Sequence, residues 1–231
     1  FLARMLMSKL PGTTRVLMID HPLDSARQML RAAADGLDLK ADERADKLTL
    51  VTRVRSALER LGRRRKQVAI ILDEAQALPD EALEEIRLMW NWEHEGRRLL
   101  QIVLVSQPEL RDRLRQPRWA ALMQRIQLSY HLEPLSKADT ARYIVHRWRM
   151  AATNGSPLRF TVRALEAIYD ATGGLPRLVN AVCDNALLTA YAAGTTRITS
   201  AIVGEVLASM TAWSLKPPQA GHEDADHAAG P

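Results

Sequence analysis

The stretch VAIILDEAQ, residues 68–76, decides the fold class of this chain. Its leading residues, 68–72, are all apolar, which is typical of a parallel strand that is covered on both faces. Two adjacent carboxylates, Asp73 and Glu74, follow directly. Removing such a pair from water is costly unless something compensates. The stretch therefore predicts a buried strand whose carboxyl end opens into the ligand crevice of an open α/β sheet.

Segments of alternating character surround this strand and predict the rest of the sheet. Other stretches with the composition of strands lie at 15–20, 99–107 and 125–132. Stretches with helical spacing lie between and after them, at 22–35, 47–62, 79–90 and 108–123. An alternation of this kind predicts a parallel sheet flanked by helices, with right-handed crossovers.

The pattern changes after Pro134. No convincing strand follows, and the remaining stretches have helical spacing, at 136–151, 161–172, 176–193 and 199–213. Ser136 and Thr161 are suitable N-caps for the first two of them. The last residues gain Pro, Gly and charge, which predicts a disordered tail. We therefore expect an α/β domain over 1–134, a small all-helical domain over 135–213 and a tail over 214–231.

The composition is that of an ordinary globular protein, with 47% hydrophobic and 26% charged residues among 231. No run is long and uncharged enough for a membrane-spanning helix. The single cysteine, Cys183, excludes an internal disulfide and lies in an apolar helical run, so we expect a packed core thiol. The net charge of +5 permits contact with nucleic acid without establishing it. The dense basic run, residues 63–66, is interpreted as a solvated turn before the buried strand.

Asp73 and Glu74 are the first candidates for chemistry. Asp73 could hold Mg²⁺ through its water shell, and Glu74 could orient and deprotonate an attacking water molecule. The alternative is a helix cap or a surface turn in which both acids are merely solvated. Gln107, after the neighbouring strand, could contact the terminal phosphate or the same water molecule. It could instead simply cap the helix that Pro108 begins.

Two arginines are further candidates for a functional role. Arg177 follows GGLP (173–176) at a helix N-terminus, where a positive charge opposes the helix macrodipole. Bound phosphates would offset this unfavourable interaction of Arg177. The alternative is that the Arg177 side chain simply extends into solvent. Arg125 lies between a helix and the last predicted strand, from where it could reach a neighbouring subunit as an arginine finger. By itself it could equally be an ordinary exposed arginine.

Taken in order, several motifs resemble one family: LDEAQ (72–76), QIVLVSQPEL (101–110), QRI (124–126), YHLEPLS (130–136) and GGLPRLVN (173–180). They look like those of the AAA+ ATPases of the ExeA/GspA type, which assist general secretion, and the resemblance spans about 1–210. It implies a P-loop NTPase fold with a parallel sheet flanked by helices, followed by a helical lid. It also implies ATP and Mg²⁺ as cofactors.

The resemblance gives each candidate a role. Asp73 corresponds to the Walker B acid that serves Mg²⁺, and Glu74 to the catalytic base. Gln107 corresponds to the sensor-1 residue, and Arg177 to the sensor-2 arginine of the lid. Arg125 is the arginine-finger candidate.

The phosphate-binding Walker A loop of the family, G-x-x-x-x-G-K-[ST], is expected immediately before Phe1, because residues 1–10 resemble the back of the helix that follows it. Without that loop we expect the 231-residue chain neither to fold robustly nor to hydrolyse ATP, whereas the full-length product does both.

The resemblance implies a homo-oligomeric ATPase that acts as a motor or switch on a secretion or envelope-assembly partner. We expect it in the cytoplasm or peripherally at the inner membrane. A DNA-binding transposition helper is an alternative, in which the basic run 63–66 contacts phosphates. A non-catalytic interaction domain is another.

Overall fold

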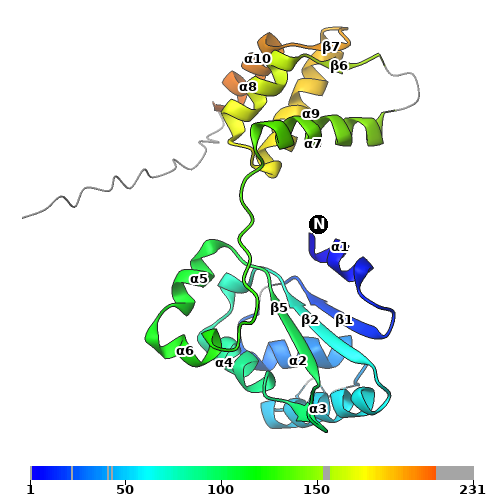
Figure 1. Ribbon diagram of the computed structural model, residues 1–231, viewed down its shortest axis with the longest axis vertical. Helices are drawn as coiled ribbons and strands as arrows, with labels where there is room; N and C mark the ends of the chain where they lie inside the picture. The colour runs from blue at the N-terminus through cyan, green and yellow to red at the C-terminus, as the bar shows by residue number, and fades with distance from the viewer. Residues whose placement is uncertain (1, 22, 41, 43, 153–156, 212–231) are drawn as a thin grey trace, which may run out of the picture. The chain divides into compact units, whose positions relative to one another are not determined.

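The computed structural model describes residues 2–21, 23–40, 42, 44–152 and 157–211. It divides into two compact units, Phe1–Ser129 and Tyr130–Pro231 (Figure 1). The tail predicted for 214–231 lies outside the described residues. Among the described residues, no helix combines the length and the apolar character that a membrane crossing requires.

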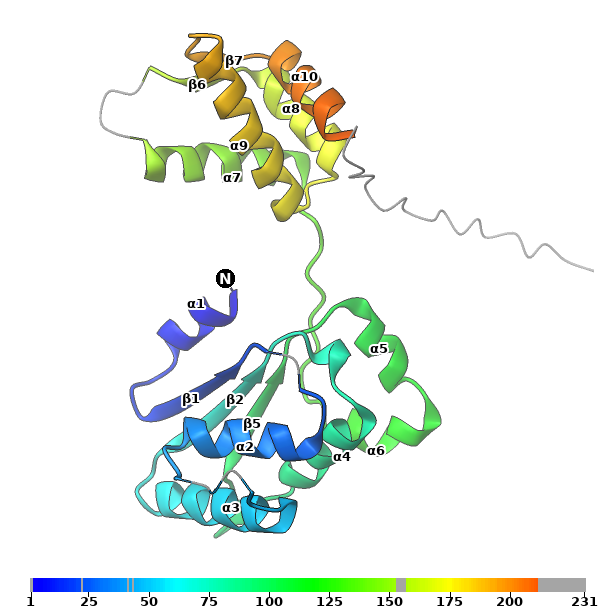
Figure 2. The same ribbon diagram turned by 180° about the vertical axis from the view of Figure 1, so that it is seen from behind.

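A parallel sheet forms the centre of the first unit (Figures 1 and 2). Its strands follow the order β1 (Thr14–Ile19), β2 (Gln67–Leu72) and β5 (Leu100–Leu104), and both pairings are parallel. Every residue of β2 after Gln67 is buried. This strand has a partner on each edge, which explains its continuous apolar sequence. The predicted parallel α/β sheet is confirmed.

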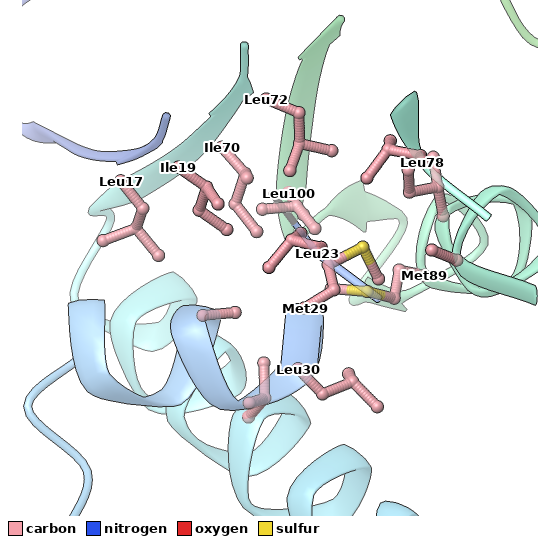
Figure 3. Packing of buried hydrophobic residues seen from close by; sticks show 14 of the residues in the cluster. Leu17, Ile19, Leu23, Met29, Leu30, Ile70, Leu72, Leu78, Met89 and Leu100 are labelled. Atoms are coloured by element: carbon pink, nitrogen blue, oxygen red, sulfur yellow. The ribbon is translucent and has the colours of Figure 1, made fainter. Parts of the chain in front are cut away.

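Three helices cover one face of this sheet: α2 (Ala26–Gly36), α3 (Lys47–Arg63) and α4 (Asp80–Met89). Figure 3 shows Leu17, Ile70 and Leu72 of the strands facing Met29 and Leu30 of α2. Side chains on alternate strand positions share one face, so these three strand residues lie in one layer. Burial of this kind contributes about 1.5–3 kcal/mol for each large apolar side chain.

Local sequence fixes where these helices begin. Ser25 caps α2 by accepting a hydrogen bond from the amide of Gln28, at 3.2 Å. Asp46 caps α3 in the same way through the amide of Thr49, at 2.7 Å. That hydrogen bond lowers the pKa of Asp46. Such caps satisfy amides that have no partner within the helix.

The predicted helix at 108–123 is divided into α5 (Pro108–Leu114), the 3₁₀ turn η2 (Pro117–Trp119) and α6 (Ala120–Met123). Pro117 explains the break, because proline lacks an amide hydrogen and disfavours helical backbone before it. A short hairpin of β3 (Glu93–His94) and β4 (Arg97–Arg98) was not predicted. Its turn places Glu95 and Gly96 at positive φ. Helix α1 (Leu2–Lys9) precedes β1.

The strand predicted at 125–132 is wrong, because those residues have no strand structure. Leu128, Tyr130 and Leu132 remain 86%, 82% and 63% exposed. Alternating apolar residues supply a face for burial, but a strand also needs a hydrogen-bonded neighbour. None of the described residues pairs with this segment.

The second unit is a helical module: α7 (Lys137–Ala151), α8 (Val162–Thr172), α9 (Pro176–Ala192) and α10 (Ser200–Thr211). Its own core includes Ile144, Ile168 and Val182. The predicted N-caps are confirmed, since Ser136 and Thr161 accept hydrogen bonds from the amides of Asp139 and Ala164. Two short parallel strands, β6 (Arg159–Phe160) and β7 (Arg197–Ile198), were not predicted.

Cys183 packs against this second core, as expected for a structural thiol. Burial raises its pKa to about 12, and the nearby Asp184 acts in the same direction. At neutral pH the thiol is therefore protonated and a poor nucleophile.

Candidate active site

The carboxyl ends of the three strands meet at one edge of the sheet. Backbone hydrogen bonds extend the pairing past the strands: the Asp73 amide donates to the Ile19 carbonyl at 2.9 Å. On the other side, the Ala75 amide donates to the Val105 carbonyl, also at 2.9 Å. The residues that follow β1, β2 and β5 are therefore held side by side. This is the edge at which open α/β sheets bind ligands.

Asp73 and Glu74 occupy the middle of this edge. Asp73 is half-buried, and its Oδ1 accepts a hydrogen bond from the Glu74 amide at 3.0 Å. Glu74 is exposed and has left-handed backbone, with φ 53° and ψ 36°. This conformation costs a non-glycine residue about 1–2 kcal/mol, and it turns the chain sharply into the 3₁₀ segment η1 (Ala75–Ala77). Glu74 precedes η1 but makes no capping bond, so the helix-cap interpretation does not describe it.

A small hollow opens beside the two carboxylates. Asp73 and Glu74 line one side of it, and Asp20 and His21, which follow β1, line another. Asp20 and His21 are not among the site residues predicted from the sequence. The signal that identified Asp73, a polar residue directly after an apolar strand, also applies to Asp20.

Gln107 is linked to the carboxylate pair through Gln76, a residue that was not predicted from the sequence. The carboxamide of Gln76 donates from Nε2 to Oε2 of Glu74 at 2.5 Å. Its Oε1 accepts a hydrogen bond from the Gln107 amide at 3.1 Å. The Gln107 side chain is exposed and makes no capping bond to α5. The structure thus brings Asp73, Glu74 and Gln107 together.

Arginines from the next helix hold the loop that carries Gln76. Arg113 donates to the Leu78 carbonyl at 2.6 Å and to the Gln76 carbonyl at 3.4 Å. Arg113 and Arg118 both pair with Asp80, and the Arg113 hydrogen bond is the main reason that the pKa of Asp80 is lowered. These contacts tie α5 and η2 to the segment that follows the central strand.

Arg125 is not part of this cluster within one chain. Its guanidinium donates to Oδ1 of Asn91 at 3.3 Å and to the Ala121 carbonyl at 2.5 Å. Asn91 follows the carboxyl-terminal end of α4. In the described part of the chain, no hydrogen bond or ion pair joins Arg125 to Asp73, Glu74 or Gln107.

Arg177 belongs to the second unit, at the start of α9. The side chain is exposed, and no hydrogen bond or ion pair joins it to another described residue. Gly173 and Gly174, just before it, have φ of +57° and +73°. Gly174 also accepts a hydrogen bond from the Leu135 amide at 3.0 Å, which fixes the start of α9 on the entry to the unit.

The carboxylates fit an ion that takes most of its ligands from elsewhere. Across the described residues, no group of three or more His, Cys, Asp or Glu side chains could hold a metal ion. Mg²⁺ is commonly bound through one or two carboxylates together with water and phosphate oxygens. Asp73, half-buried at the rim of the hollow, offers such an oxygen ligand.

Comparison with known proteins gives the family. A family profile described as an AAA domain matches residues 1–114. General secretion pathway protein A of Aeromonas hydrophila is 38% identical over 196 residues, which cover 85% of this chain and 36% of that protein. The chain belongs to the AAA+ family. Within it, the chain is of the general secretion pathway protein A type, and it spans about a third of the length of that relative.

Solved structures confirm the fold of this AAA+ domain. The ORC2 protein of Aeropyrum pernix, solved as ADPNP–ADP complexes, superposes with a TM-score of 0.67 at 16% identity, over 93% of this chain and 56% of that one. Cdc6p of Pyrobaculum aerophilum superposes with a TM-score of 0.65 at 17% identity, over 85% of this chain and 52% of that one. At such identities the likeness establishes the P-loop AAA+ fold alone.

Proposed function

We propose that this AAA+ domain carries Mg²⁺-dependent ATP hydrolysis and works as a motor or switch in secretion or cell-envelope assembly. One observation supports the chemistry most strongly. Asp73 and Glu74 directly follow the central buried strand and line a hollow, and Glu74 is linked through Gln76 to the backbone amide of Gln107, which follows the next strand. The sequence relationship to general secretion pathway protein A supports the cellular role.

The residues divide the work by position. Asp73 would hold Mg²⁺, through its water shell, beside the phosphates of ATP. When bound, the ion neutralises charge that develops on the phosphate oxygens. Glu74 orients a water molecule and accepts its proton. Gln107 contacts the terminal phosphate or the attacking water molecule, and Arg177 of the helical unit reaches the phosphates.

Replacing Glu74 tests the base. Glu74→Gln keeps the size of the side chain but removes its basicity, so we expect ATP turnover to fall by about 10²–10⁴-fold while ATP binding is kept. The measurement is steady-state hydrolysis, together with binding of a fluorescent ATP analogue, by the protein expressed from its whole gene. Glu109→Gln is the matched control, because Glu109 is exposed in the first turn of α5 and outside the cluster. Turnover at the full rate in Glu74→Gln removes Glu74 from the mechanism.

Arg125 is proposed to act in trans, in a homo-oligomer. Arg125→Ala is expected to lower turnover by about 10³-fold or more, only under conditions in which the oligomer forms. Mixing provides the sharper test. A subunit with Arg125→Ala keeps Glu74 and would receive Arg125 from a Glu74→Gln neighbour, so the mixture should regain activity that neither variant has alone. A mixture that stays inactive while assembled, as judged by light scattering, argues against a finger in trans.

We place the protein in the cytoplasm or peripherally at the inner membrane, with a secretion or envelope-assembly protein as partner. The name of the relative that is 38% identical, general secretion pathway protein A, supports a partner in secretion.

A second candidate function, DNA binding in the manner of a transposition helper, is favoured by one surface feature. The run Arg63, Arg64, Arg65 and Lys66 leads into β2, and Arg97 and Arg98 lead towards β5. Val68 is paired with Leu100, so the two basic runs precede neighbouring strands. A gel-shift series in increasing salt tests it, because phosphate contacts predict a steep loss of affinity with salt. ATPase activity without any DNA shift supports the secretion role instead.

A further inference from the structure

We propose that Gln76 is a positioning residue that couples the base Glu74 to the end of strand β5. The inference rests on the proposed function for the role of Glu74. It concerns a residue that the family roles above leave unassigned.

The side-chain amide of Gln76 is used at both ends. Nε2 donates to Oε2 of Glu74 at 2.5 Å, and Oε1 accepts from the Gln107 amide at 3.1 Å. The two partners fix which way the amide lies, because a carboxylate only accepts and a backbone amide only donates. A primary carboxamide supplies the donor and the acceptor that this bridge needs. Glutamate lacks the donor when ionised, and asparagine is shorter by one methylene group.

The backbone under Gln76 is held in place from both sides. The preceding residue, Ala75, is fully buried and donates its amide to the Val105 carbonyl at 2.9 Å. The Gln76 and Leu78 carbonyls accept hydrogen bonds from Arg113. Since the main chain is fixed, the reach of the Gln76 side chain determines where Glu74 and Gln107 stand relative to each other.

The Glu74 side chain needs a contact that fixes its conformation. It is exposed, and the side-chain partner found for it among the described residues is Gln76, which binds Oε2. An exposed glutamate with no contact samples several rotamers. With Oε2 engaged, Oε1 is free to accept a proton from water. A shift of Gln107 on contact with phosphate would also be passed to Glu74 through the same bridge.

The test separates the two halves of the bridge with three variants of the full chain. Gln76→Ala removes both hydrogen bonds. Gln76→Glu keeps an acceptor for the Gln107 amide but puts a second carboxylate against Glu74. Gln67→Ala is the control, because Gln67 is an exposed glutamine at the start of β2, the strand whose other end leads to Gln76. Circular dichroism and thermal melting of each variant confirm that it is folded.

Hydrogen–deuterium exchange of the Gln107 amide is the readout that does not depend on hydrolysis. Exchange is expected to be at least about tenfold faster in Gln76→Ala, because the amide loses its acceptor, and unchanged in Gln76→Glu and Gln67→Ala. Unchanged exchange in Gln76→Ala overturns the bridge.

Steady-state kinetics is the second readout. We expect kcat to fall by about 10–100-fold in both Gln76→Ala and Gln76→Glu, with KM for ATP unchanged, because the base is misplaced and binding is not. If exchange of the Gln107 amide is faster in Gln76→Ala but kcat is unchanged, the positioning role of Gln76 is overturned. The proposed ATPase function is not affected by that result. If the unsubstituted protein hydrolyses no ATP, the proposed function and the positioning role both fall. The exchange measurement still decides whether the bridge exists.

Discussion

At the scale of single residues, Gly173 and Gly174 differ in what surrounds them. Both have positive φ, but a Cβ on Gly173 would meet nothing within 4 Å, whereas one on Gly174 would lie 1.9 Å from the Leu135 carbonyl oxygen. Gly174→Ala is therefore expected to cost more than about 3 kcal/mol of unfolding free energy, since backbone must move.

Gly173→Ala provides the matched comparison at a cost of about 1 kcal/mol, because it meets only the strain of left-handed backbone. Urea unfolding followed by circular dichroism measures both. Equal losses for the two glycines would mean that the close approach to Leu135 does not constrain the entry to α9.

Some residues of the candidate site could be predicted from the sequence and others could not. Asp73 and Glu74 were predicted because removing a carboxylate pair from water at the end of a buried strand is costly unless something compensates. Gln107 was predicted from the same position on the next strand. Gln76 was missed, since a half-buried glutamine in a turn carries no signal until its two partners are seen together.

At the scale of elements, the central strand is expected to dominate stability. Ile71 is fully buried in β2 and is paired with both Met18 and Val103. Ile71→Ala should cost about 3–4 kcal/mol. Val103 is half-buried, and its strand pairs with one other strand among the described residues, so Val103→Ala should cost about 1–2 kcal/mol. Equilibrium urea unfolding measures the difference. A larger loss at Val103 than at Ile71 would contradict the central place of β2.

The elements that sequence predicted correctly are those whose signals are local. Helix spacing, N-caps at Ser136 and Thr161, and the apolar run of β2 all act within one turn or one strand. The segment 125–132 failed because pairing depends on residues far away in sequence. The two-residue strands β6 and β7 are too short to leave any periodicity.

At the scale of the whole molecule, each of the two units has its own hydrophobic core, and the cores share no residue. Leu58, 1% exposed, belongs to the first core, and Ile168, fully buried, belongs to the second. Units of this size can each bury enough apolar surface to unfold as a separate cooperative body.

We therefore expect each core substitution to act on its own unit. Leu58→Ala and Ile168→Ala should each cost about 3 kcal/mol, which raises globally limited amide exchange about a hundredfold in the substituted unit. Exchange of amides in β2 and α9 reports on the two units separately. Faster exchange of α9 in Leu58→Ala, at a rate matching that of β2, would show instead that the chain unfolds as one cooperative body.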